Sequence, residues 1–227
     1  MEQPKSFRYL DLITGLFTAV LLISNVASSK IVSLGGLSFD GGTLLFPLAY
    51  IFGDVLTEVY GYARGRRVIW TGFFSLMLLS VVLAVVGSIP PDPQWPHAQA
   101  YDLILGQTPR IVLASLTAYF AGEFANSYVL AKMKVASSGK HLWMRTIGST
   151  LVGEGLDTAV FVLAAFYGTL SDDLLWRVLA ANYIFKVGVE VILTPVTYAL
   201  IGTLKKLENE DFYDYATDFN PFRLGPG

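Results

Sequence analysis

The sequence predicts an all-α integral membrane protein with six transmembrane helices and both termini in the cytoplasm. The composition indicates a membrane protein, because 53% of the 227 residues are hydrophobic and only 15% are charged. A soluble domain of this length needs more polar surface. Six apolar runs have close to the ~20 residues that a helix needs to cross the hydrocarbon core. The basic residues gather in alternate connections, which orients the helices.

The first apolar run follows a short polar arm, has full spanning length and lacks a small-residue cleavage site. It is therefore predicted to be a retained first helix and not a signal peptide. The second run starts apolar and ends at three closely spaced arginines, and the third follows directly. Polar or proline-rich connections separate the remaining runs. The predicted spans are residues 9–28, 43–62, 68–89, 108–131, 146–167 and 178–204.

The positions of the 16 Lys and Arg residues test this count. Twelve lie in the N-terminal arm, the second-to-third connection, the fourth-to-fifth connection and the C-terminal tail. Three lie on the opposite side, and Lys186 lies inside a span. Because cytoplasmic connections carry the excess of basic residues, this distribution predicts cytoplasmic termini and an even number of spans. Residues 1–206 are expected to form the transmembrane domain. Residues 207–227 are expected to form an acidic cytoplasmic tail that is partly disordered or rests on the protein.

The external connection, residues 87–109, holds four closely spaced prolines followed by an amphipathic turn over residues 98–105. One interpretation is a rigid spacer with an interfacial helix. The other is a lid over an outward-facing cavity. Both interpretations stay open at the level of the sequence.

Seven ionisable side chains fall inside the predicted spans. They include pairs three or four residues apart, and the members of each pair share a helix face. Counted from the outer end of each span, at ~1.5 Å per residue, most of them lie near the bilayer midplane. Turning these faces toward one shared cavity is the least costly arrangement. The seven residues are Asp54, Glu58, Glu123, Glu154, Asp157, Lys186 and Glu190.

The charges in this set are unbalanced, with six carboxylates and one lysine. Six ionised carboxylates cannot share a low-dielectric site, so some must be protonated, paired with Lys186 or neutralised by a cationic ligand. An alternative is a set of interhelical hydrogen bonds that hold the bundle together. Such contacts average well under ~1 kcal/mol each in bilayers. The number of carboxylates therefore favours a functional site.

Other polar and helix-breaking residues support a cavity. Asn25 and Asn126 lie inside the first and fourth spans, while Pro47 and Pro195 are expected to interrupt the second and sixth. Broken helices in a membrane are tolerated where they line protein or water, and a packing kink is the equal alternative for each proline. A faint similarity between the second and fifth spans also suggests a weak 3+3 inverted repeat, which the uncharged third span argues against.

Five segments of the chain form a recognisable set. They are SNVASSK (24–30), FPLAYIFGDVLTEVYG (46–61), EFANSYVLAK (123–132), RTIGSTLVGEGLDT (145–158) and YIFK (183–186). Together they resemble the queuosine precursor transporter family, which was earlier grouped with the vitamin uptake transporters. The resemblance covers residues 9–206. It implies a six-helix inner-membrane importer of 7-deazaguanines, such as the 7-cyano and 7-aminomethyl precursors of queuosine.

The residues inside the spans agree with such a substrate. A 7-deazaguanine presents two adjacent N–H donors, and Asp54 or Asp157 is expected to accept them as a bidentate pair. Lys186 or an Asn amide can donate to the ring carbonyl, and aromatic side chains such as Tyr50 can stack on the ring. A carboxylate-rich cavity also favours the cationic aminomethyl form. The predicted substrate-binding residues are Asp54, Glu58, Glu123, Asn126, Glu154, Asp157, Lys186, Glu190, Asn25 and Tyr50.

Other classes of protein stay open. One is the substrate-binding membrane subunit of an ATP-driven vitamin importer, and another is a non-transporting bundle. An intramembrane enzyme is not expected, because the chain has no cysteine and the spans contain no Ser–His pair. No cofactor, metal or nucleic-acid partner is expected, and a homodimer stays open. Uptake is expected to be proton-linked through Glu58 or Glu123, with simple facilitation as the alternative.

Overall fold

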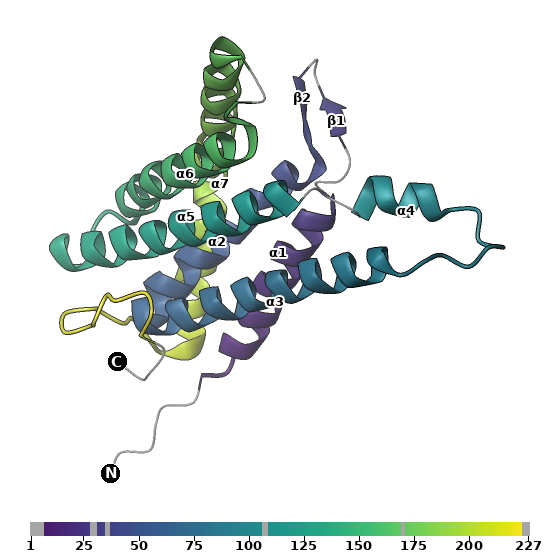
Figure 1. Cartoon of the computed structure of the whole chain (residues 1–227). Helices are drawn as coiled ribbons and strands as arrows, with labels where there is room; N and C mark the ends of the chain where they lie inside the picture. Colours follow the sequence, from purple (N-terminus) through teal and green to yellow (C-terminus); the bar gives the residue numbers. More distant parts are fainter. Residues whose placement is uncertain (1–6, 28–30, 35–36, 106–108, 169–170, 224–227) are drawn as a thin grey trace.

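The computed structural model describes residues 7–27, 31–34, 37–105, 109–168 and 171–223. It is a bundle of helices with one short two-stranded hairpin after the first helix (Figure 1). The prediction of a helical protein is confirmed, whereas the hairpin was not predicted. In chain order the elements are α1 (Leu10–Ala27), β1 (Ile31–Leu34), β2 (Leu37–Asp40), η1 (Gly41–Leu44), α2 (Phe46–Val55), η2 (Leu56–Tyr60), α3 (Tyr62–Ser88), α4 (Ala98–Leu105), α5 (Pro109–Ala136), α6 (Leu142–Phe166) and α7 (Asp172–Glu208).

The hairpin occupies the first connection. β1 and β2 are antiparallel, with Ile31 opposite Asp40 and Leu34 opposite Leu37. The sequence carries a signal for this pairing, because a Gly-Gly dipeptide between two short runs is typical of tight hairpins. The chain therefore reaches the second predicted span through a strand and the short 3-10 turn η1.

Four helical segments are long and apolar enough to cross a membrane, by length and composition: Leu10–Ala27, Tyr62–Ser88, Leu142–Ala164 and Leu175–Glu208. They correspond to the first, third, fifth and sixth predicted spans. The second predicted span is divided between α2 and η2, and the fourth corresponds to α5, whose centre carries several polar residues. The described helices thus support a multi-pass membrane protein. The total of six spans remains a prediction.

The start of the second predicted span differs from its expected form. Pro47 lies in the first turn of α2, where the backbone N–H it lacks has no partner within the helix. It therefore begins the helix and does not interrupt it. Thr43, whose carbonyl was expected to be freed, belongs to the preceding turn η1. Pro195 lies inside α7, which runs from Asp172 to Glu208 without a break, so the expected interruption of the sixth span is not seen.

The end of the same span changes from α-helix to π-helix at Leu56. This π segment, η2, ends before Gly61, which has a φ of 87°. A side chain at Gly61 would be strained by that φ and would overlap the ring of Phe212. Asp54 lies in α2 and Glu58 lies in this π segment, one turn further along the chain.

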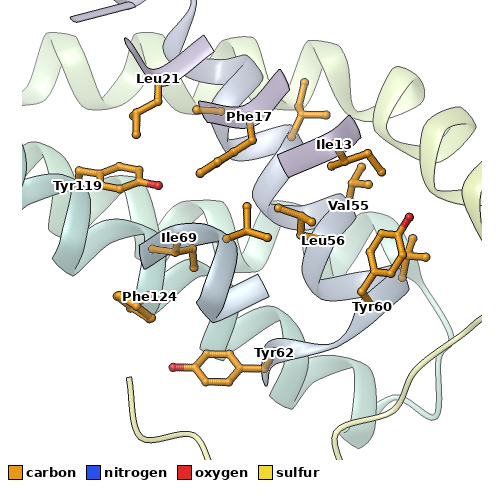
Figure 2. Close-up of a cluster of buried hydrophobic side chains, with 14 of the residues drawn as sticks. Ile13, Phe17, Leu21, Val55, Leu56, Tyr60, Tyr62, Ile69, Tyr119 and Phe124 are labelled. Carbon is orange, nitrogen blue, oxygen red and sulfur yellow. The ribbon is translucent and has the colours of Figure 1, made fainter. Parts of the chain in front are cut away.

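The main apolar core lies where α1, α2, η2, α3 and α5 meet (Figure 2). α1 contributes Phe17 and Leu21, which are fully buried. The Tyr119 ring from α5 lies 6.4 Å from the Phe17 ring, measured between centroids. Val55 of α2 belongs to the same core and directly follows Asp54. The core therefore fixes the rotation of the helix that carries this carboxylate.

α5 and α6 approach each other closely at two glycines. A Cβ atom on Gly122 would lie 2.9 Å from the backbone oxygen of Gly153 and 2.6 Å from the Cβ atom of Asp157. A Cβ atom on Gly153 would lie 2.7 Å from the Cβ atom of Asn126. Small residues allow membrane helices to pack in this way. The close approach brings Asn126 and Asp157 to one interface.

One end of the bundle gathers segments that were predicted to share a side of the membrane. Glu208, at the end of α7, accepts a hydrogen bond from the backbone N–H of Tyr9 at 2.7 Å and from the Tyr60 hydroxyl at 2.9 Å. Lys134, near the end of α5, donates to the backbone oxygen of Phe212 at 2.7 Å. The start of α1 and the tail after α7 both lie toward this end in Figure 1. The arrangement agrees with the predicted alternation of spans, and the side of the membrane remains a prediction.

The tail after α7 lies along the start of α3. The backbone N–H of Tyr62 donates to both carboxylate oxygens of Asp214 at 3.1 Å. The Trp70 indole donates to the backbone oxygen of Pro221 at 2.7 Å. Of the two forms expected for this segment, the described residues 209–223 show the one that rests on the protein.

The connection that was predicted to be external contains α4, with the bounds that the amphipathic turn predicted. α4 lies beside the end of α3 and apart from the α6–α7 pair (Figure 1). A pocket of about 240 Å³ lies between α3 and α4, and its lining includes Val86, Pro90, Trp95 and Tyr101. The lid remains a hypothesis.

Labelling of introduced cysteines should report the orientation of the bundle. The chain has no native cysteine, and Ser88, Ser138 and Ser171 are exposed. Ser88→Cys and Ser171→Cys are expected to react with an impermeant maleimide added outside intact cells. Ser138→Cys should react only after the membrane is permeabilised. The reverse pattern would invert the predicted orientation, and equal labelling of all three would overturn the span count.

Candidate functional site

Lys186 on α7 pairs with two carboxylates of α6. Its ammonium nitrogen is in ion-pair contact with Asp157 and lies 3.1 Å from a carboxylate oxygen of Glu154. Glu154 and Asp157 are three residues apart on one helix, so a single cation reaches both. This lysine therefore joins α6 to α7.

Asp54 on α2 is bound to α5. The Asn126 amide nitrogen donates to one oxygen of Asp54 at 2.8 Å, and both side chains are fully buried. The other oxygen of Asp54 and the amide oxygen of Asn126 have no hydrogen-bond partner among the described residues. One oxygen of each side chain is therefore free to accept a further hydrogen bond.

Glu123 on α5 and Glu190 on α7 have no such partners. Both side chains are buried, and neither oxygen of either carboxylate is hydrogen-bonded within the described part of the chain. The Glu123 carboxylate lies against the backbone of α2 at Gly53, where any Cβ atom would overlap it. Its charge interacts with those of Glu154, Asp157 and Glu190. We call these four carboxylates, together with Asp54, Asn126 and Lys186, the central cluster.

Two tyrosine hydroxyls border the cluster. Tyr50 and Tyr119 are buried, and neither hydroxyl has a hydrogen-bond partner in the ranges that the structure describes. The Tyr50 hydroxyl lies 2.7 Å from where a Cβ atom on Gly122 would be, which places it at the α5–α6 interface. It interacts electrostatically with Glu154, Asp157 and Glu123. Tyr50, which was predicted as a stacking residue, therefore also offers a donor to the cluster.

Glu58 belongs to a separate group of charges, which we call the basic end. Arg145 holds the Glu58 carboxylate through two guanidinium nitrogens, and the Lys205 ammonium lies 2.9 Å from it. Lys134 lies 3.7 Å from the same carboxylate. Asp211 of the tail bridges Lys134 and Lys205 at 2.6 and 2.8 Å. Burial alone would raise the pKa of Asp211, but hydrogen bonds from the two lysines hold that pKa below its usual range.

The structure thus leaves two predicted site residues outside the cluster. Glu58 was expected to join the cluster with Asp54, four residues earlier, but it lies one turn nearer the end of the span, where the cations of the basic end hold its carboxylate. Asn25 donates to the backbone oxygen of Leu21 at 3.0 Å within α1, and no hydrogen bond joins it to the cluster in the described ranges. The eight other predicted site residues lie in the central cluster or border it.

The residues of the basic end were missed as a group. Lys134, Arg145 and Lys205 entered the sequence argument only as charges that orient the membrane spans. Their positions next to span ends, at the same predicted depth as the end of the second span, could have suggested that they meet Glu58.

The central cluster is chemically incomplete. It holds five carboxylates and one lysine, and Asp54, Glu123 and Glu190 present five oxygen atoms without hydrogen-bond partners in the described residues. A buried polar group left without a partner costs about 1–3 kcal/mol, so native proteins keep such groups chiefly where a ligand, ion or water uses them. Within the described ranges, no group of three His, Cys, Asp or Glu side chains is arranged to hold a metal ion.

Apolar helices of spanning length around a buried, polar, partly unpartnered cluster are the features of a multi-pass membrane transporter. Comparison with known proteins agrees. The model of the family described as "Putative vitamin uptake transporter" matches residues 40–200. The chain belongs to this family.

Two individual relatives of the chain are also named as transporters. The chain is 31% identical over 189 residues to a Bacillus subtilis protein named "Probable queuosine precursor transporter", with 82% of each chain covered. It is 27% identical over 172 residues to a Haemophilus influenzae protein of the same name, with 74% of this chain and 71% of that one covered. A weaker similarity of 24% covers only 17% of the DNA translocase FtsK of Mesorhizobium japonicum. No solved structure matches the chain. The protein is a transporter and not an enzyme.

Proposed function

We propose that the protein imports queuosine precursors, the 7-cyano- and 7-aminomethyl-7-deazaguanines, across the inner membrane. The observation that carries the proposal is the central cluster, in which Asp54, Glu123 and Glu190 present carboxylate oxygens without hydrogen-bond partners among the described residues. The names of the two relatives supply the substrate class. The same names favour direct import over the alternative of a membrane subunit of an ATP-driven vitamin importer.

The chemistry of a 7-deazaguanine matches what the cluster lacks. The ring N–H and the exocyclic amine are adjacent donors, and a carboxylate that accepts both forms a strong paired contact. The ring carbonyl is an acceptor, and the hydroxyls of Tyr50 and Tyr119 are donors without partners among the described residues. The ammonium of the aminomethyl form would also offset the excess of negative charge.

Queuosine formation in cells tests the import directly. A bacterial strain that can neither make the precursor nor import it should contain unmodified tRNA. Expression of this protein is expected to restore queuosine in tRNA when either precursor is supplied in the medium. An empty vector provides the control. If the protein reaches the membrane and the tRNA stays unmodified with both precursors, the proposed function is wrong.

We also propose that uptake is linked to protons, with a buried carboxylate of the central cluster as the carrier. Glu123 is buried without partners in the described structure, whereas Glu58 is held by three cations at the basic end. An inwardly directed proton gradient is expected to accelerate uptake into proteoliposomes. An uptake rate that changes with neither the pH gradient nor the membrane potential would indicate facilitated diffusion.

Asp54→Asn is expected to weaken precursor binding. The substitution keeps the shape of the side chain but replaces one carboxylate oxygen with an amine, which would face a donor of the substrate or of Asn126. The loss of a charged hydrogen bond, together with a buried group left unpaired, corresponds to about 30- to 1,000-fold in affinity. Equilibrium binding to the purified protein measures this change. Asp102→Asn, in exposed α4, is the control and should bind like the wild type.

A further inference from the structure

The free oxygens of the central cluster are distributed unequally among its carboxylates. A carboxylate that accepts hydrogen bonds from two adjacent donors uses both of its oxygens. Lys186 forms ion pairs with Glu154 and Asp157. Asn126 donates a hydrogen bond to one oxygen of Asp54. Among the described residues of the cluster, only Glu123 and Glu190 keep both oxygens unpartnered.

The surroundings distinguish Glu123 from Glu190. A guanine-like edge presents its ring carbonyl next to the two donors, so the carboxylate that reads it needs a hydrogen-bond donor nearby. The unpartnered hydroxyls of Tyr50 and Tyr119 both interact electrostatically with Glu123. Tyr119 also precedes Glu123 by four residues on α5 and shares its helix face. The neighbours that act on the Glu190 charge are all carboxylates: Glu154, Asp54 and Glu123.

Gly53 leaves the space that the Glu123 carboxylate fills. The carboxylate lies against the α2 backbone, in the space that a Cβ atom on residue 53 would fill. Gly53 directly precedes Asp54, so the same turn of α2 presents a gap for one carboxylate and carries another. A larger residue there must displace the Glu123 side chain.

We propose that Glu123 accepts the ring N–H and the exocyclic amine of the 7-deazaguanine, that the Tyr50 hydroxyl donates to the ring carbonyl, and that Gly53 determines specificity by leaving room for Glu123. This assignment rests on the proposed function. The ion pairs of Lys186 with Glu154 and Asp157 then hold α6 against α7, and these three side chains do not hydrogen-bond the base.

A pair of ligands tests the assignment. The first is 7-cyano-7-deazaguanine, and the second is the same compound without the exocyclic amine. The wild type should prefer the first. In Glu123→Gln, the first ligand is expected to bind about 30- to 1,000-fold more weakly, and the preference between the two should fall at least about tenfold. The new amide can still accept the ring N–H, but it opposes the exocyclic amine with a donor. Glu190→Gln is the matched control and should keep the preference.

A second variant acts on the same carboxylate without changing its charge. Gly53→Ala should reduce the preference as Glu123→Gln does, while Gly15→Ala, where a Cβ atom meets nothing within 4 Å, should not. The assignment is overturned if both Glu123→Gln and Gly53→Ala keep the wild-type preference, or if Glu190→Gln loses it instead. Either outcome leaves the proposed function standing. If the folded wild type binds neither ligand, the proposed function fails, and this assignment fails with it.

Discussion

Glu58→Gln is expected to destabilise the protein more than any other single removal of a carboxylate. Glu58 is fully buried, and its carboxylate faces Arg145, Lys134 and Lys205. The first two of these cations are themselves 1% exposed. Removal of one partner from a buried ion pair leaves the other charge uncompensated and costs about 3–5 kcal/mol. The melting temperature of the detergent-purified variant should therefore fall by several degrees or more.

Asp173→Asn is the control for this prediction. Asp173 pairs with Arg177 on α7 at 3.0 Å, and both side chains are 75% exposed. Exposed pairs of this kind contribute within about 0.5 kcal/mol, so the melting temperature should stay near that of the wild type. If Glu58→Gln melts like Asp173→Asn, the basic end does not hold the helices together as its geometry indicates.

Lys186→Met should have a comparable effect at the central cluster. Lys186 is the lysine that the described structure places among five carboxylates, and it contacts Asp157 and Glu154 directly. Methionine fills a similar volume but leaves both acidic groups without a cation. The expected loss of stability is again about 3–5 kcal/mol, measured as a lower melting temperature and a lower yield of folded protein. Lys206→Met, at an exposed position near the end of α7, should change little.

A double variant separates lost charge from lost packing. If the loss in Lys186→Met comes from uncompensated carboxylates, then Lys186→Met combined with Asp157→Asn should recover part of the stability. If the loss comes from the packing of the lysine stem, the double variant should be no more stable than the single one. The second result would remove Lys186 as the charge partner of α6.

Helical periodicity predicted the central cluster well because its residues lie on continuous α-helices. The three-residue spacing of Glu154 and Asp157 places both on one face of α6, as expected. The depth count for Asp54 and Glu123 also succeeded, since Gly53 and Glu123 are in contact in the structure. These inferences needed only the rise and turn of an α-helix.

Helical periodicity did not predict the π-helical segment that carries Glu58. A π-helical segment depends on the tertiary contacts that stabilise its unusual hydrogen bonds, and no residue type predicts it from the sequence. Here the tail supplies such contacts, because the backbone N–H of Phe212 donates to Val59 within η2 at 3.3 Å. The partner of the π segment thus lies more than 150 residues away in the sequence.

The partners of Lys186 show a second limit of local spacing. Glu190 is four residues away on the same helix and is the partner that spacing alone favours. The structure pairs Lys186 with α6 because the neighbouring helix presents two carboxylates at its level. Which carboxylates keep free oxygens follows from this choice, and the sequence alone left it open.

Uptake by the purified protein tests the central claim most directly. The protein is reconstituted into lipid vesicles without ATP or any other protein, and labelled 7-aminomethyl-7-deazaguanine is added outside. We expect saturable accumulation above that of protein-free vesicles, competition by the unlabelled 7-cyano form, and a large loss of uptake at low substrate concentration in Asp54→Asn but not in Asp102→Asn. Uptake no faster than in protein-free vesicles, with folded protein in both orientations, would contradict the account.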